Sequence, residues 1–263
     1  MNNFTQRAIT GAVFVATVIG LSLWSAYSFM ALLIIIAAVA MWEFYALLGI
    51  QSVAQKLLCI GLGLAMITSK YWFDSALLVL PLAFPLIAIS VLFSQQRSFK
   101  TLAILATAIL YIALPLSLMH FSVFSISGHY QAVLAINLFT LIWCSDTFAY
   151  LSGKLLGKRK LFPSVSPGKT WEGVIGGMIL TGIAAYGLGI LWQIPVQVNA
   201  VIGILTVVFG TLGDLVESML KREVNVKDSG SILPGHGGML DRFDALLLSL
   251  PFTTACYWWM MYH

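Results

Sequence analysis

The residues best suited to chemistry lie in one stretch near the end of the chain, GDLVESMLKREVNVKDSGSILPGHGGMLDRFD. Asp214 and Glu217 are three residues apart and Ser218 is four residues from Asp214, so a helix would place them on one face. Asp241 and Asp244 repeat the three-residue spacing. Carboxylates hold Mg²⁺ well, and the lysines and arginines between them can neutralise phosphate oxygens. The pattern indicates a metal-dependent site for phosphate chemistry; a solvated, merely structural loop is the alternative.

A glycine-rich turn, Pro-Gly-His-Gly-Gly, separates the two pairs of acids. Its glycines allow the backbone to approach a ligand closely. His236 within the turn could bind zinc, but no second His or Cys lies at ligand spacing. Because hard oxygen ligands favour Mg²⁺, we interpret His236 as a phosphate contact or as a donor that fixes the loop.

A further acid lies upstream, in the motif CSDTFAY. Eight of the ten acidic residues fall between Asp146 and Asp244, and Asp146 is the first of them. Carboxylates in an apolar segment are costly, so each suggests a functional site. We predict that Asp146 is a site carboxylate; a structural pair with Lys154 is the alternative.

The basic loop that follows contains Ser-Pro-Gly-Lys-Thr. It is no Walker A motif, because a proline stands where that motif needs its first glycine. Ser166 and Pro167 instead predict the N-cap and first position of a helix. Lys169 and Thr170 would then lie in its first turn, where free N–H groups and the helix dipole favour a phosphate. For the cations at 158–160, an anchor on the positive side of the membrane is the better interpretation.

Composition decides the class of protein that must position these residues. Of the 263 residues, 60% are hydrophobic and only 9% are charged, whereas soluble domains carry about 25% charged residues. The mean hydropathy is +0.94. Period-2 alternation is absent, so no strands are expected. The sequence therefore predicts an all-α polytopic membrane protein and excludes a soluble one.

Uncharged runs long enough to cross a bilayer predict about nine transmembrane helices. Their approximate ranges are 8–24, 28–48, 57–73, 76–93, 101–120, 131–150, 171–192, 198–217 and 243–261. The third is the least secure, because Lys56 and Lys70 leave a short uncharged stretch between them. We expect two parts, lipid-facing scaffold helices over 1–125 and helices with catalytic loops over 126–263.

Lysine and arginine accumulate on cytoplasmic loops. With nine spans, one side carries thirteen of the fourteen cations and leaves only Lys70 on the other. We therefore predict an integral membrane protein with a cytoplasmic N-terminus and an active site that faces the cytoplasm. The net charge of +4 then belongs to a face beside anionic headgroups, so the lipid bilayer, and no nucleic acid, is the expected partner.

At these residues the sequence resembles the phosphatidate cytidylyltransferase (CDP-diacylglycerol synthase) family. The family signature is present as Ser218, Lys221, Arg222, Lys227, Asp228, Gly230, Pro234, His236, Gly237, Gly238, Asp241, Arg242 and Asp244. Ser145-Asp146, Ala149-Tyr150 and the segment 166–173 are also similar, although many members have a second Lys where this chain has Gly168. The resemblance covers residues 144–244.

The resemblance implies transfer of a cytidylyl group from CTP to phosphatidate, with Mg²⁺ as cofactor, a homodimer, and a place in the bacterial inner membrane. The lipid phosphate is already charged, so catalysis would rest on positioning and charge neutralisation. The catalytic residues assigned on this basis are Asp214, Asp241, Lys221 and Arg222. The metal ligands are Asp146, Asp214, Asp241 and Asp244. The phosphate-binding residues are Lys169, Thr170, Ser218, Lys227, His236 and Arg242.

Other functions fit less well. A secondary transporter also has acids within membrane helices, but it predicts mid-span acids and a repeat symmetry that this sequence lacks. A CTP-dependent lipid kinase, or a synthase that uses another lipid phosphate, stays open as a nearer alternative. The CDP-alcohol phosphotransferases expect Asp-Gly-x-x-Ala-Arg followed by further Asp, and that motif is absent.

Overall fold

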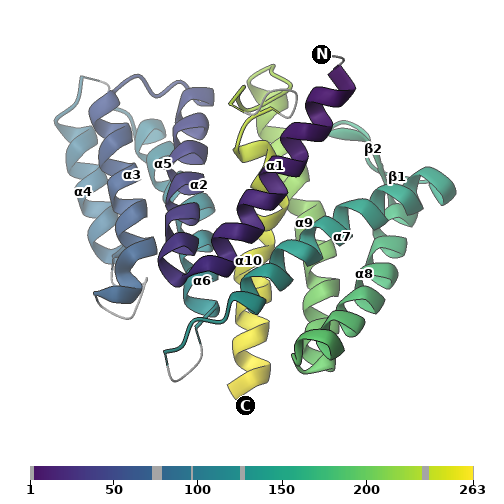
Figure 1. The fold of residues 1–263 in the computed structure, drawn as a ribbon. Helices are drawn as coiled ribbons and strands as arrows, with labels where there is room; N and C mark the ends of the chain where they lie inside the picture. The colour runs from purple at the N-terminus through teal and green to yellow at the C-terminus, as the bar shows by residue number, and fades with distance from the viewer. Residues whose placement is uncertain (1–2, 73–78, 96, 125–127, 233–236, 263) are drawn as a thin grey trace. The chain divides into compact units, whose positions relative to one another are not determined.

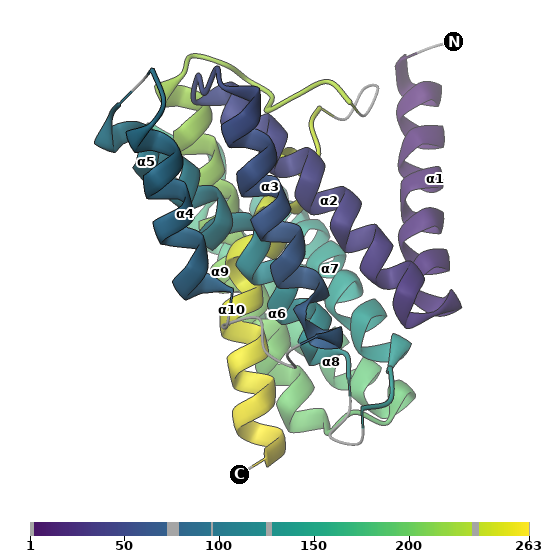
Figure 2. The ribbon, with the colours of Figure 1, turned by 90° about the vertical axis from the view of Figure 1, so that its left-hand side faces the viewer.

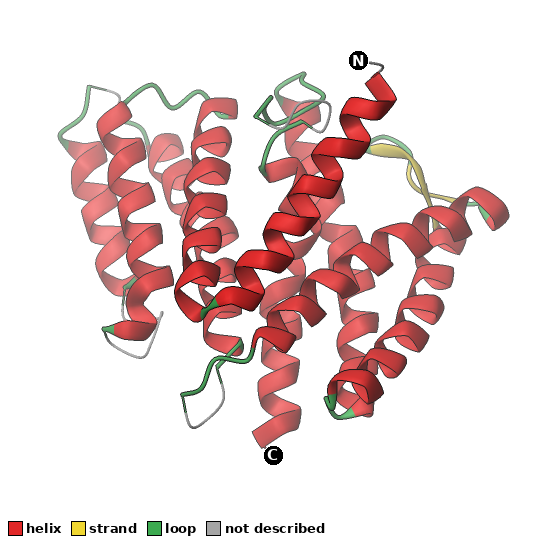
Figure 3. Ribbon diagram, viewed as in Figure 1, coloured by secondary structure: helices red, strands yellow, loops and turns green. Residues whose placement is uncertain are grey.

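The computed structural model describes residues 3–72, 79–95, 97–124, 128–232 and 237–262. Within these ranges nearly all regular structure is helical, which confirms the predicted all-α class (Figures 1 and 3). The chain forms two compact units that are each interrupted in sequence. The first unit consists of Met1–Tyr130 and Val226–Arg242, and the second consists of Gln131–Asn225 and Phe243–His263. The segment Val226–Arg242 therefore belongs to the same unit as the N-terminal helices.

The first unit is a bundle of apolar helices. Its helices are α1 (Asn3–Trp24), α2 (Ala26–Leu47), α3 (Val53–Thr68), α4 (Leu80–Leu92), α5 (Phe99–Ala108) and α6 (Leu114–Ser122). A 3₁₀ turn, η1 (Ser69–Tyr71), extends α3, and a π-helical segment, η3 (Ile109–Ala113), joins α5 to α6. α2 and α3 pack against each other and both contact α6 (Figure 2). Fully buried Phe29, Leu33 and Tyr45 make α2 the centre of this unit.

The second unit holds the long helices that carry most of the acids. They are α7 (Ala132–Leu156), α8 (Trp171–Trp192), α9 (Val196–Glu223) and α10 (Leu240–Tyr262), whose first three residues belong to the first unit. A buried amide pair links them: Asn137 donates to the side chain of Asn199 at 2.6 Å, and Asn199 donates to the carbonyl of Ala185 at 2.7 Å. Buried amides need such partners, so these bonds join α7, α8 and α9.

Six helical segments of the described part are long and apolar enough to cross a membrane. They are Ala26–Leu47, Val53–Tyr71, Phe99–Ser122, Ala132–Leu156, Trp171–Trp192 and Val196–Glu223. Shorter apolar stretches occupy Ile9–Trp24 and Leu80–Leu92. These segments coincide with the first eight predicted spans, although the fourth was expected to begin at 76, outside the described residues. The ninth predicted span lies in α10, and the chain is a polytopic membrane protein.

The loop between α7 and α8 departs from the predicted architecture. A short antiparallel hairpin pairs β1 (Lys160–Phe162) with β2 (Ser166–Thr170), the yellow segment of Figure 3. The predicted helix start at Ser166 and Pro167 is therefore wrong, because both residues lie in β2 and α8 begins only at Trp171.

A carboxylate in the first turn of α8 holds the two residues that precede β1. Glu172 accepts hydrogen bonds from the N–H groups of Lys158 at 3.0 Å and Arg159 at 3.1 Å. Thr170 then serves as the N-cap, and its Oγ1 accepts from the N–H of Gly173 at 3.1 Å. The preference of Ser-Pro for a helix start is local, and these bonds over 13 and 14 residues override it.

Small residues allow α8 to pack closely between its neighbours. A Cβ atom added at Gly177 would lie 3.1 Å from the Cβ of Ala149 in α7 and 3.2 Å from Cγ1 of Val207 in α9. Small residues at such crossings are typical of membrane helices, which gain stability from close packing. Gly177 therefore has no room for a side chain.

We expect Gly177→Leu to lower the free energy of unfolding by about 1–3 kcal/mol, because the added side chain overpacks this crossing. The measurement is the thermal unfolding midpoint of the purified protein in detergent. Gly187→Leu is the control, since it adds the same side chain to α8 where nothing lies within 4 Å. Equal midpoints for the two variants would contradict the packing assignment.

Candidate active site

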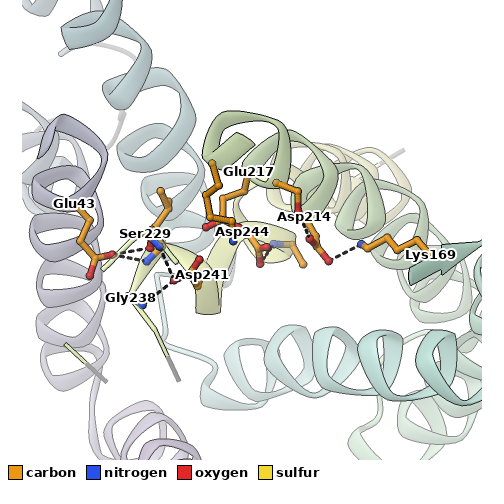
Figure 4. Close-up of polar contacts among 12 residues, drawn as sticks. Glu43, Lys169, Asp214, Glu217, Ser229, Gly238, Asp241 and Asp244 are labelled. Carbon is orange, nitrogen blue, oxygen red and sulfur yellow. Dashed lines mark hydrogen bonds and ion pairs between the residues drawn. The ribbon is translucent and has the colours of Figure 1, made fainter. Parts of the chain in front are cut away.

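The predicted site residues fall into two groups, one in each unit (Figure 4). The lysine–carboxylate cluster, in the second unit, consists of Asp146, Lys169, Asp214, Lys221 and Asp244. The loop clamp, in the first unit, consists of Glu43 and Asp241 together with the segment 229–240 that they hold.

Asp214 is the centre of the lysine–carboxylate cluster. Lys169 Nζ, from the end of β2, lies 2.6 Å from Asp214 Oδ2, and Ser218 Oγ donates to Asp214 Oδ1 at 3.1 Å. The second bond confirms that Asp214 and Ser218 share a helix face. The Lys169 side chain is 23% exposed and that of Asp214 is 38% exposed. The ion pair is therefore ordered and still accessible to a ligand.

One turn further along α9, Lys221 compensates a buried acid. Its Nζ lies 2.6 Å from Oε2 of Glu217, whose side chain is 0% exposed. A buried carboxylate without a counter-charge costs several kcal/mol, so this pair stabilises the C-terminal end of α9. Lys221 thus has a structural task, and its predicted phosphate contact stays a prediction.

Asp244 brings α10 to the cluster. Its Oδ1 accepts from the N–H of Ala245 at 2.7 Å, and its carboxylate lies within electrostatic range of Asp214, Asp146 and Lys221. α10 can approach α9 this closely because a Cβ at Gly213 would collide with the carbonyl oxygen of Asp244. Glycine beside Asp214 therefore permits two acids from different helices to interact.

The donor chemistry of this cluster fits Mg²⁺. Asp146, Asp214 and Asp244 come from three helices, and carboxylate oxygens with substrate phosphates are the usual Mg²⁺ ligands. Among the described residues, no three acidic, His or Cys side chains are close enough to surround an ion alone. A metal here would share Asp214 with Lys169 and Ser218, and it would need oxygens from the substrate.

Thr170 is buried and its hydroxyl is committed to the cap of α8. A Cβ added at Gly153 of α7 would lie 3.1 Å from Thr170 Oγ1, so the two helices meet tightly at this residue. The cap explains the residue type without a ligand. A phosphate contact of Thr170 stays a prediction.

In the loop clamp, Asp241 closes the signature loop on itself. Its Oδ2 accepts from the N–H of Ser229 at 2.9 Å and from the N–H of Gly238 at 2.8 Å. Gly237 has φ +83°, a conformation that favours glycine, and a Cβ there would lie 2.6 Å from the same oxygen. A metal bound to Asp241 would compete with these donors for Oδ2.

Glu43 of α2 is the second acid of the loop clamp, and it was not among the predicted site residues. It is 5% exposed, and it accepts from the N–H of Met239 at 3.0 Å and the N–H of Leu240 at 2.9 Å. Ser229 Oγ donates to it at 3.3 Å. Its partners lie 186 to 197 residues away, so only the presence of an acid in an apolar stretch could have identified it.

The remaining predicted residues have less defined places. Arg222, Lys227 and Arg242 are exposed, near the C-terminal end of α9, in the following loop and in the first turn of α10. His236 lies outside the described residues. Their assignments as catalytic or phosphate-binding residues stay predictions.

The comparison with known proteins covers both groups of residues in one family match. A family model described as the cytidylyltransferase family matches residues 5–260. The chain belongs to the cytidylyltransferase family. The cytidylyltransferase match extends well beyond the resemblance over 144–244 and includes α2 with Glu43.

Individual members of the cytidylyltransferase family give the same relationship. A phosphatidate cytidylyltransferase of Haemophilus influenzae is 36% identical over 208 residues, which cover 76% of this chain and 70% of the relative. One of Bacillus subtilis is 52% identical over 114 residues, or 43% of this chain and 42% of the relative. One of Staphylococcus haemolyticus is 39% identical over 177 residues, or 66% of this chain and 65% of the relative.

We expect Thr170→Val to lower the free energy of unfolding by about 1 kcal/mol, because valine keeps the shape of threonine but loses the capping oxygen. The measurement is again the thermal unfolding midpoint in detergent. Thr147→Val on α7 is the control, since that exposed hydroxyl donates to the carbonyl of Trp143 in its own helix. A Thr170→Val protein as stable as the control would contradict the capping role.

Proposed function

We propose that this chain is a phosphatidate cytidylyltransferase, which transfers a cytidylyl group from CTP to phosphatidate and releases pyrophosphate. The observation that carries the proposal is the lysine–carboxylate cluster, in which acids for a metal and lysines for phosphates lie close to Asp214 or Asp244. Relatives that bear this name, at 36% and 52% identity, support the choice of substrates.

The reaction makes demands that such a cluster can meet. A phosphate oxygen of phosphatidate forms a bond to the α-phosphorus of CTP, while the bond from that phosphorus to the oxygen bridging to the β-phosphorus breaks. The attacking oxygen is already ionised, so no strong base is needed. Catalysis then depends on bringing two anions together and neutralising their charge.

The cations of the chain are proposed to neutralise these phosphates. Lys169 is the principal candidate, because its ion pair with Asp214 holds the ammonium in place while leaving it accessible. Ser218 would add a hydroxyl beside it. The further cations and polar groups of the proposed set are Thr170, Lys221, Arg222, Lys227, His236 and Arg242.

Asp146, Asp214 and Asp244 are proposed to hold Mg²⁺, with Asp241 as the further predicted ligand. When bound, the ion supplies positive charge to the phosphate oxygens. The three aspartates would hold the ion at the cluster, and the charge of Lys169 would reduce the repulsion between their carboxylates.

The chain is an integral membrane protein. We propose that its site faces the cytoplasm, at the inner membrane of a bacterium, because thirteen of the fourteen cations fall on the predicted cytoplasmic side. There CTP would arrive from water and phosphatidate from the bilayer. A homodimer is proposed from the family resemblance alone.

We expect the purified chain, given CTP, Mg²⁺ and phosphatidate in detergent, to release pyrophosphate and form CDP-diacylglycerol in equal amounts. Pyrophosphate is measured by a coupled assay and the lipid by mass spectrometry. Production of CDP with a phosphorylated lipid would favour the CTP-dependent lipid kinase. A folded chain that makes neither product would refute the proposal.

We expect Asp214→Asn and Asp244→Asn each to lower turnover at least about 100-fold, because each removes a charge that steadies the transition state. The Mg²⁺ concentration for half-maximal rate should rise in whichever variant retains activity. Glu223→Gln, an exposed acid in the last turn of α9, is the control and should change turnover little.

Asp241→Asn separates the two roles open to Asp241. If Asp241 is a metal ligand, its substitution should raise the Mg²⁺ concentration needed for half-maximal rate, as in Asp214→Asn. If Asp241 only closes the loop, its substitution should lower turnover and leave that concentration unchanged. Near-normal turnover of Asp214→Asn would remove the metal assignment even if the reaction itself were confirmed.

A further inference from the structure

Within the first unit, the buried acid Glu43 of α2 contacts the signature loop. Glu43 Oε1 accepts from the N–H of Met239 at 3.0 Å, and its Oε2 accepts from the N–H of Leu240 at 2.9 Å and from Ser229 Oγ at 3.3 Å. All three donors belong to the segment 229–240. One carboxylate on α2 therefore joins the beginning and the end of this loop.

Two glycines of the loop lie directly against the Glu43 carboxylate. A Cβ added at Gly238 would lie 2.5 Å from Glu43 Oε2, and a Cβ added at Gly230 would overlap Glu43 Oε1. Gly230 and Gly238, both in the family signature, thus let the backbone lie close to the carboxylate. The close fit shows that the loop is shaped to this acid rather than merely resting on α2.

Glu43 also caps the helix that carries the acids. Met239 and Leu240 lie at the start of α10, where backbone N–H groups have no partner within the helix. A carboxylate at this end is favoured by the helix dipole. An acid in an apolar span is costly. The bonds from Met239 and Leu240 offset that cost for Glu43.

We infer that Glu43 is a positioning residue of the active site. It fixes Ser229 at the beginning of the loop and Met239 and Leu240 at its end, and through them the orientation of Asp241 in the first turn of α10. The inference rests on the proposed function for its effect on catalysis, although the clamp itself does not. Glu43 touches no substrate in this assignment.

Glu43→Gln is the sharpest test, because glutamine keeps the size but offers one acceptor oxygen in place of two. We expect faster hydrogen exchange at the amides of Met239 and Leu240 and a loss of kcat of roughly 10- to 100-fold, as small misplacements of reacting groups cause. The KM for phosphatidate should change less than about threefold, because Glu43 itself touches no substrate.

The control is Gln55→Ala on α3. Gln55 is 5% exposed, as Glu43 is, but it donates to the carbonyl of Ser90 at 3.4 Å and not to the loop. It should leave both exchange and kcat unchanged. If Glu43→Gln and Gln55→Ala behave alike, Glu43 is only a packing residue and the inference is overturned.

A second pair of variants keeps the test decisive if Glu43→Gln folds poorly. Gly230→Ala should displace the carboxylate and lower kcat in the same way, and adding it to Glu43→Ala should cost nothing further. Additive losses would contradict the inference. If the wild type makes no CDP-diacylglycerol, the proposed function fails, and amide exchange in the full chain still decides whether Glu43 holds the loop.

Discussion

A charge at or within a membrane helix is costly unless a partner compensates for it. Both the lysine–carboxylate cluster and the loop clamp meet this constraint. The second unit uses counter-charges, as in the ion pairs Lys169–Asp214 and Lys221–Glu217. The first unit uses backbone donors, which surround Glu43 and Asp241. The difference matters for function, because an ion pair can exchange its lysine for a ligand while a carboxylate held by N–H groups fixes the backbone.

Local relations were the part of the structure that the sequence could predict. The scarcity of charge specified a polytopic helical protein, since apolar helices are what a bilayer accepts. The spacing of Asp214 and Ser218 predicted their shared helix face, because residues four apart are neighbours on a helix. The signature residues indicated the family, which the match over residues 5–260 now shows.

Relations between distant residues could not be predicted in this way. Ser166 and Pro167 favour a helix start locally, but they lie in a hairpin. The N–H groups of Lys158 and Arg159, before that hairpin, donate to Glu172 after it. Glu43 was assigned to the scaffold, because no pattern of spacing connects it with donors nearly 200 residues away. The segment Val226–Arg242 groups with Met1–Tyr130 in one compact unit, a relation that spacing along the chain does not reveal.

The sequence distance between Glu43 and its donors also matters during biosynthesis. α2 is synthesised early, whereas the N–H groups that donate to Glu43 are synthesised 196 and 197 residues later. At typical rates of about 5–20 residues per second, the interval is about 10–40 s. Through that interval the nascent chain holds an acid in an apolar segment without its final partners. A loop that is translated late therefore completes the packing of the first helices, so a chain truncated before residue 239 leaves its N-terminal bundle unfinished.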